Sequence, residues 1–176
     1  MLAPDVWVAS LEELDPELLL RRGVQGVVLD IDNTLLAWNQ ASADEVTRAR
    51  VARLKQAGLA VVLLSNATSR RRQAVARELG VPCCPGPKPL RRAFLRAART
   101  VGLPPHRLAV VGDQLWTDVL GARRAGMVAV LVNPISRREH WLTRLGRLLE
   151  RLALQGLVRC GKLPRQLWEA RYGSRG

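Results

Sequence analysis

The sequence predicts an α/β fold in which a doubly wound, mainly parallel sheet carries helices on both faces. Short apolar runs without polar alternation recur along the chain, as is typical of strands that are buried on both sides. Helical patterns with capping residues separate these runs. The regular alternation of strand and helix favours right-handed crossovers between parallel strands.

Five apolar segments are predicted to form the sheet. Four have the length of a buried strand, and the fifth is a short run before a proline-rich stretch. In chain order they cover residues 24–31, 59–66, 81–84 (the short one), 107–113 and 127–134. The helical patterns between and before them cover residues 15–23, 42–58, 69–80, 89–102 and 116–126.

Capping residues mark where several of these helices begin. Residues 10–13 (SLEE) have the form of a capping box, and so does Ser42 with Glu45. Asp15 is the expected N-cap of the first helix. Pro89 is expected at the first position of the helix over 89–102, where its missing N–H is tolerated.

We expect one compact domain over residues 1–155 and a basic C-terminal tail over 156–176. Residues 136–156 form an amphipathic, arginine-rich helical pattern. The favoured interpretation is a last helix that packs on the sheet with a solvated arginine face. The alternative is a helix that lies on anionic lipid. Its apolar face consists of Trp141, Leu142, Leu145, Leu148, Leu149, Leu152 and Leu154.

The net charge of +13 is the unusual bulk property of the chain. Such a charge attracts nucleic acid, anionic lipid or phosphorylated small molecules, although arginine usage can also reflect genome composition. The N-terminus lacks the pattern of a secretory signal, and the apolar runs are too short to cross a bilayer. We therefore expect a cytoplasmic protein, with the inner membrane face as an alternative location.

The cysteines and histidines do not have the spacing of a disulfide framework or a zinc site. Cys83 and Cys84 are adjacent, and His106 and His140 are far apart in the sequence. Any metal ion would therefore have oxygen ligands.

Polar residues gather where the predicted strands end. Because ligands of doubly wound sheets bind at the carboxyl ends of the strands, several such clusters together indicate a binding site. One lysine, in a chain that has only three, precedes the proline of a predicted helix start and supports the same conclusion. The residues are Asp30, Asp32, Asn33 and Thr34 after one strand, Ser65 and Asn66 after the next, Lys88, and Asp113 with Asp118 after a later one.

These residue types favour phosphoryl transfer. A carboxylate can attack phosphorus to give an aspartyl-phosphate, and a second carboxylate can protonate the leaving oxygen and then activate water. Because carboxylates and phosphate repel one another, a cation is needed, and an aspartate-rich site favours Mg²⁺. Ser65 and Asn66 are placed to hold phosphate oxygens, and Lys88 would neutralise the transferring group.

The sequence resembles the haloacid dehalogenase (HAD) superfamily of phosphohydrolases. Its four motifs resemble residues 30–35 (DIDNTL), Ser65-Asn66, Lys88-Pro89 and 112–118 (GDQLWTD), in the same order. The resemblance implies a Rossmann-like fold, Mg²⁺ dependence and a phospho-aspartate intermediate. The short connections imply a member without a cap domain. More narrowly, the chain looks like the YqeG-like branch of subfamily IIIA, which is related to mitochondrial phosphatidylglycerophosphate phosphatases.

The resemblance also implies roles for individual residues. Asp30 would be the nucleophile and a metal ligand, and Asp32 the acid/base with its main-chain carbonyl on the metal. Asp113 would be the further metal ligand. The remaining roles are phosphate binding by Ser65, Asn66 and Lys88, support by Asp118 near Lys88 or a metal-bound water, and shaping of the turn by Asn33 and Thr34.

The function expected from the sequence is therefore that of a Mg²⁺-dependent phosphomonoester phosphatase. Its expected substrate is the head-group phosphate of phosphatidylglycerophosphate. Two alternatives remain open at this point. The first is a phosphatase for nucleic-acid ends or other phosphorylated metabolites, and the second is a non-catalytic protein that binds RNA or a GTPase.

Overall fold

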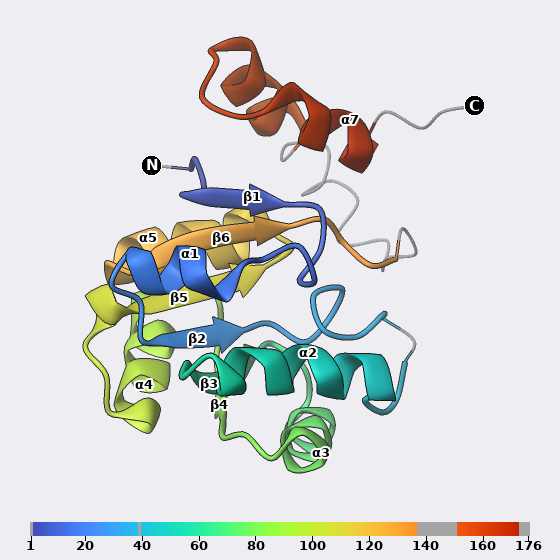
Figure 1. Ribbon diagram of the computed structural model, residues 1–176, viewed down its shortest axis with the longest axis vertical. Helices are drawn as coiled ribbons and strands as arrows, with labels where there is room; N and C mark the ends of the chain where they lie inside the picture. The colour runs from blue at the N-terminus through green and yellow to red at the C-terminus, as the bar shows by residue number, and fades with distance from the viewer. Residues whose placement is uncertain (1, 39, 137–150, 173–176) are drawn as a thin grey trace.

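The structure, a computed structural model, describes residues 2–38, 40–136 and 151–172, and its centre is one six-stranded sheet. The strand order is β1-β6-β5-β2-β3-β4, and all five pairings are parallel. This confirms the predicted parallel, doubly wound sheet (Figure 1). The strands are β1 Val6–Val8, β2 Gly26–Leu29, β3 Ala60–Ser65, β4 Cys83–Pro85, β5 Leu108–Gly112 and β6 Val128–Val132.

Helices cover both faces of the sheet. One face carries α1, α2 and α3, and the other carries α4 and α5. Single helices connect β2 to β3 and β3 to β4, so the described residues of these two connections contain no cap domain. The helices are α1 Pro16–Arg21, α2 Glu45–Gln56, α3 Ser69–Leu79, α4 Arg91–Val101, α5 Leu120–Ala125 and α7 Arg165–Tyr172, with a 3₁₀ turn at Pro105–Arg107 and a π-helical turn at Leu115–Val119.

The central strands β2, β5 and β6 are apolar throughout because both of their faces are covered. Val27 and Leu29 of β2 belong to the core under α1, α2 and α3. Val28, between them, belongs to the core under α4 and α5 together with Phe94. Successive side chains of a strand point to opposite faces, so a two-sided core needs an apolar residue at every position.

Several local predictions were wrong. The cap of α2 is Asp44, which accepts a hydrogen bond from the Thr47 amide (2.8 Å), and not Ser42. Residues 10–13 form a bend and a turn instead of a helix start. The helix expected from Pro89 begins two residues later.

Two further elements differ from the prediction. The expected helix over 116–126 is a π-helical turn that continues into α5. The edge strand β1 was not predicted. It pairs with β6 through three residues, from Val6 opposite Val130 to Val8 opposite Val132.

Residues 151–172 pack on the face of the sheet that carries α4 and α5. Residues 151–159 are helical and are followed by α7. Leu154 and Leu163 are buried in the core of that face, whereas Leu152 is 56% exposed. The predicted apolar residues from Trp141 to Leu149 lie outside the described residues. The boundary at residue 155 stays a prediction.

None of the described helices combines the length and the hydropathy that a membrane crossing requires.

Candidate active site

Two neighbouring strands place the first two carboxylates side by side. Asp30 directly follows β2, and Asp113 directly follows β5, which pairs with β2. The Asp30 amide donates to the main-chain oxygen of Val111 (3.0 Å), so the hydrogen bonding between β2 and β5 extends to Asp30, the first residue of the first motif. Because the strands are parallel, both carboxylates emerge at the same edge of the sheet.

Lys88 connects the third motif to these carboxylates. It follows β4, and its Nζ lies 2.7 Å from Asp30 Oδ1 and 2.7 Å from Asp118 Oδ1. Its main-chain amide donates to Asn66 Oδ1 (2.9 Å), which fixes the loop that carries it. The lysine is buried, so its charge acts in a medium that screens it poorly.

Asp118 is held by hydrogen bonds at both carboxylate oxygens. Oδ1 accepts from Lys88, and Oδ2 accepts from the Gln114 amide (3.2 Å) and the Thr117 hydroxyl (3.3 Å). Its side chain lies against Gly112, where an added Cβ would come within 2.2 Å of the carboxylate carbon. The glycine of the fourth motif therefore makes room for this carboxylate.

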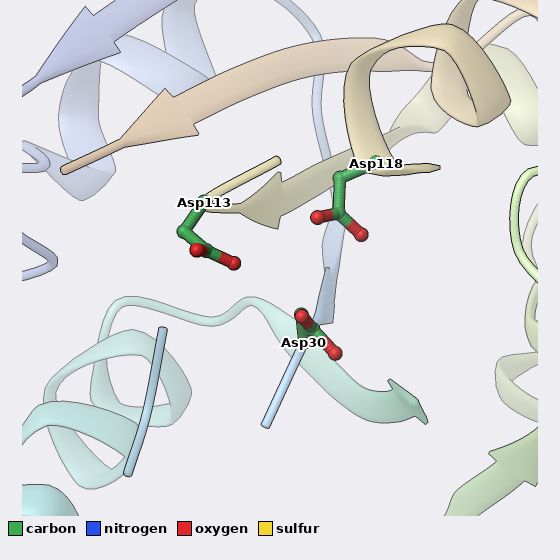
Figure 2. Close-up of side chains that lie close together, drawn as sticks. All are labelled: Asp30, Asp113 and Asp118. Carbon is green, nitrogen blue, oxygen red and sulfur yellow. The ribbon is translucent and has the colours of Figure 1, made fainter. Parts of the chain in front are cut away.

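Three carboxylates face one another in the site. One oxygen of each of Asp30, Asp113 and Asp118 lies within 4.8 Å of the others, and all three residues are buried (Figure 2). Carboxylates gathered in this way are a suitable donor set for a hard divalent cation.

The charges of the site shift its protonation equilibria. Burial, assisted by repulsion from Asp118 and Asp113, outweighs the attraction of Lys88 and raises the pKa of Asp30 to about 8. Burial by itself would lower the pKa of Lys88, but attraction to Asp118 and Asp30 more than offsets it and raises that pKa. The lysine therefore stays charged, and Asp30 needs a further positive charge to be ionised at neutral pH.

The turn after β2 carries Asp32, whose carboxylate pairs with an arginine and is not one of the three clustered carboxylates. Asn33 has a φ of +60°, and its amide donates to the main-chain oxygen of Leu36 (2.7 Å). Asp32 instead contacts Arg71 of α3, with Nη2 at 2.9 Å and Nε at 3.1 Å from Oδ1. The Thr34 hydroxyl is buried and has no hydrogen-bond partner among the described residues.

The second motif lies at the end of β3, just before α3 begins. Ser65 is buried, and its Oγ accepts a hydrogen bond from the Ala67 amide (3.1 Å). Asn66 is exposed apart from its contact with the Lys88 loop. Thr68 then caps α3 by accepting from the Arg71 amide.

The structure therefore brings four chain-distant motifs to one edge of the sheet. Asp30, Lys88, Asp113 and Asp118 form a contiguous cluster, with Asn66 tied to it. Asp32 is held by Arg71, a residue that the sequence analysis did not single out. A second missed residue is Arg171, whose Nη2 donates to the main-chain oxygen of Asp113.

Comparison with known proteins agrees with this geometry. A family model described as haloacid dehalogenase-like hydrolase matches residues 41–126. The chain is 36% identical over 167 residues to "Probable phosphatase YqeG" of Bacillus subtilis, which covers 94% of this chain and 95% of that protein.

The chain belongs to the haloacid dehalogenase-like hydrolases.

A second relative extends the similarity to eukaryotes. Phosphatidylglycerophosphate phosphatase 1, chloroplastic/mitochondrial, of Arabidopsis thaliana is 30% identical over 178 residues, or 92% of this chain. The chain spans about half the length (49%) of that relative. Together with the family membership, these relatives show that the chain is a phosphatase.

Solved structures show the same fold at low sequence identity. A HAD family hydrolase from Deinococcus radiodurans, solved with phosphate and sodium bound, superposes with a TM-score of 0.51 at 16% identity. The match covers 77% of this chain and 96% of that one. The cobalt-bound deoxy-D-mannose-octulosonate 8-phosphate phosphatase from Haemophilus influenzae superposes with a TM-score of 0.51 at 17% identity, over 63% and 69% of the two chains. The Rossmann-like HAD fold predicted from the sequence is thereby confirmed.

Proposed function

We propose that this HAD phosphatase is a Mg²⁺-dependent phosphomonoesterase that works through an aspartyl-phosphate on Asp30. The contact that carries the proposal is the placement of Lys88 Nζ 2.7 Å from both Asp30 and Asp118. It puts a charged lysine beside the buried carboxylate of Asp30, which also lies close to the carboxylates of Asp113 and Asp118. Such a lysine can neutralise a phosphoryl group that approaches the nucleophile.

The chain's own residues account for both steps of the reaction. An oxygen of Asp30 would attack phosphorus while the ester bond to the leaving oxygen breaks, and Asp32 would protonate that oxygen. Water would then lose a proton to Asp32 and attack the phosphorus, which releases inorganic phosphate and restores the carboxylate. Arg71, on Asp32 Oδ1, would keep the acid/base oriented.

Mg²⁺ fits the residues at this edge of the sheet. Asp30 and Asp113 would hold it through carboxylate oxygens, and Asp32 through its main-chain carbonyl. Asp118 is engaged by Lys88, Gln114 and Thr117 and would support the lysine. When bound, the ion would neutralise the carboxylates and the phosphate, and it would lower the pKa of Asp30 from about 8 into the range where the nucleophile is ionised.

Substrate phosphate would be held by the second and third motifs. Lys88 Nζ lies 2.7 Å from Asp30, and the Lys88 amide donates to Asn66 Oδ1, so both residues would be near a phosphate on Asp30. Together with the Ser65 hydroxyl at the end of β3, their donors would bind phosphate oxygens. The buried Thr34 hydroxyl, on the turn that contains Asn33, would be a further donor to phosphate.

The proposed substrate is the head-group phosphate of phosphatidylglycerophosphate, and the proposed subfamily is IIIA. The name of the Arabidopsis relative supports this substrate, and so does the net charge of +13, because the lipid is anionic. Among the described residues, single helices connect β2 to β3 and β3 to β4, and such short connections would suit a phosphate carried on a surface. The enzyme would then act at the inner membrane face.

The test compares substrates and one matched pair of variants. Vesicles that contain phosphatidylglycerophosphate and a 5′-phosphorylated oligonucleotide are each incubated with the protein and Mg²⁺, and released phosphate is measured. Asp30→Asn is expected to lower turnover by more than about 1,000-fold, because it removes the nucleophile. Asp15→Asn makes the same chemical change at the cap of α1, where Asn caps equally well, and is expected to retain turnover.

The outcomes separate the substrate from the chemistry. Release from the oligonucleotide but not from the vesicles would reject the lipid and retain the phosphatase mechanism. Turnover by Asp30→Asn at the rate of the unaltered protein would reject the role of Asp30.

A further inference from the structure

The last helix places a buried arginine at the edge of the sheet that carries the proposed site. Arg171 of α7 is 7% exposed. Its Nη1 donates to the main-chain oxygen of Val132 (2.7 Å) and its Nη2 to that of Asp113 (2.5 Å). Val132 ends β6 and Asp113 follows β5, so one side chain joins the carboxyl ends of two neighbouring strands.

The chemistry of this contact favours arginine over other residues. A buried guanidinium is costly unless its donors find acceptors, and here the planar fork reaches two carbonyl oxygens at once. Its Nε also donates to the Tyr172 hydroxyl (3.2 Å), and its guanidinium carbon lies 5.7 Å from the centre of that ring. Lysine has a single nitrogen and cannot reproduce the fork.

The segment that carries Arg171 is itself packed. Trp168 and Tyr172 of α7 lie with ring centroids 5.8 Å apart. The guanidinium of Arg151, from the preceding helical residues, lies 5.9 Å from the first ring and 5.7 Å from the second. Leu154 and Leu163 anchor this part of the chain in the core of the sheet. Figure 1 shows α7 on the side toward which the arrowheads of β1 and β6 point.

We infer that Arg171 is a positioning residue for the divalent-cation site. By holding the main-chain oxygen of Asp113, it restrains the backbone from which that carboxylate projects toward Asp30. The C-terminal helix, 58 residues from Asp113, thereby becomes part of the cation site without contacting the ion. The inference rests on the proposed function in one respect, namely that Asp113 is a ligand of the cation.

The test measures cation binding directly. Mn²⁺ is titrated into the metal-free full chain and free Mn²⁺ is followed by electron paramagnetic resonance, with no substrate present. Arg171→Met is expected to weaken Mn²⁺ binding by about 10-fold, the usual loss when a residue that supports a metal ligand is removed. Arg171→Lys is expected to recover only part of that loss. Arg165→Met, which changes an arginine with an 82% exposed side chain on the same helix, is expected to bind as the unaltered protein does.

A kinetic measurement separates positioning from general damage. Arg171→Met should need more Mg²⁺ for half-maximal turnover, while KM for the phosphorylated substrate at saturating Mg²⁺ should change by less than about 2-fold. Mn²⁺ binding is measured without turnover, so the two proposals can fail separately. If the protein binds Mn²⁺ but hydrolyses no phosphate ester, the proposed function is wrong, and the Mn²⁺ affinities of the Arg171 variants still decide this inference.

Three results would overturn the inference. The first is an unchanged Mn²⁺ dissociation constant in a folded Arg171→Met or Arg171→Lys protein. The second is loss of folding in both variants, which would show that the residue maintains the fold and not the cation site. The third is an unaltered protein that binds no Mn²⁺.

Discussion

The clearest prediction concerns the pH dependence of cation binding. The pKa of Asp30 is raised to about 8 by burial and by its neighbouring carboxylates. Below that pH the carboxyl is protonated, and a cation must displace its proton in order to bind. Affinity for a divalent cation is therefore expected to fall as pH drops below about 8 and to level off above it.

The magnitude follows from the pKa. Well below the pKa, one displaced proton corresponds to about a 10-fold loss of affinity per pH unit. Because about half of the Asp30 carboxyls are already protonated at pH 8, the loss between pH 8 and pH 6 is about 50-fold. At pH 7, about 0.9 proton should be released for each bound ion, since that fraction of a group with a pKa of about 8 is protonated. Lys88 does not contribute because its pKa is raised and it remains charged throughout this range.

Isothermal titration calorimetry with Mn²⁺, in buffers of different ionisation enthalpy, measures both quantities. The matched control is Asp30→Asn, which keeps the size of the side chain but has no proton to release. It should bind Mn²⁺ more weakly and without proton release from this position. An affinity that is constant between pH 6 and pH 8, with no proton released, would refute the electrostatic account of the site.

Two further predictions concern packing and are tested by urea unfolding. Gly112→Ala is expected to lower the free energy of unfolding by about 1–3 kcal/mol and to reduce turnover, because its Cβ would strike Asp118. Gly156→Ala, at a helical position where the added Cβ meets nothing within 4 Å, should be neutral or stabilising, and equal effects at both glycines would refute the argument. Leu154→Ala should lower the free energy of unfolding by about 2–5 kcal/mol, whereas exposed Leu152→Ala should change it by less than about 0.5 kcal/mol. Similar values would show that the helical residues 151–159 are not docked on the sheet.

Much of the fold could be predicted because buried parallel strands leave a plain signal. Strands such as β2 and β5 need apolar residues at every position, and this distinguishes them from helices and from surface strands. Strand β1 was missed because three residues at a sheet edge give too short a pattern. Asp44 was missed as a cap because Ser42, two residues earlier, is an equally suitable cap in sequence terms.

The residues of the site that directly follow strands could be predicted from the sequence. Asp30 and Asp113 follow strands directly, so the parallel sheet brings them together without further information. The ion pair between Asp32 and Arg71 depends on how a turn and a helix meet, and the run of arginines in α3 does not distinguish one from the next. The contacts of Arg171 could not be predicted because they depend on the docking of a terminal helix.

The central claim is that a carboxylate oxygen of Asp30 attacks phosphorus and carries the phosphoryl group. Its most direct test is the stereochemistry at phosphorus, measured with an isotopically chiral thiophosphate analogue of a hydrolysed monoester in water enriched in the third oxygen isotope. Two successive displacements, one by Asp30 and one by water, predict retention of configuration in the released thiophosphate. Inversion would show a single attack by water and would contradict the account.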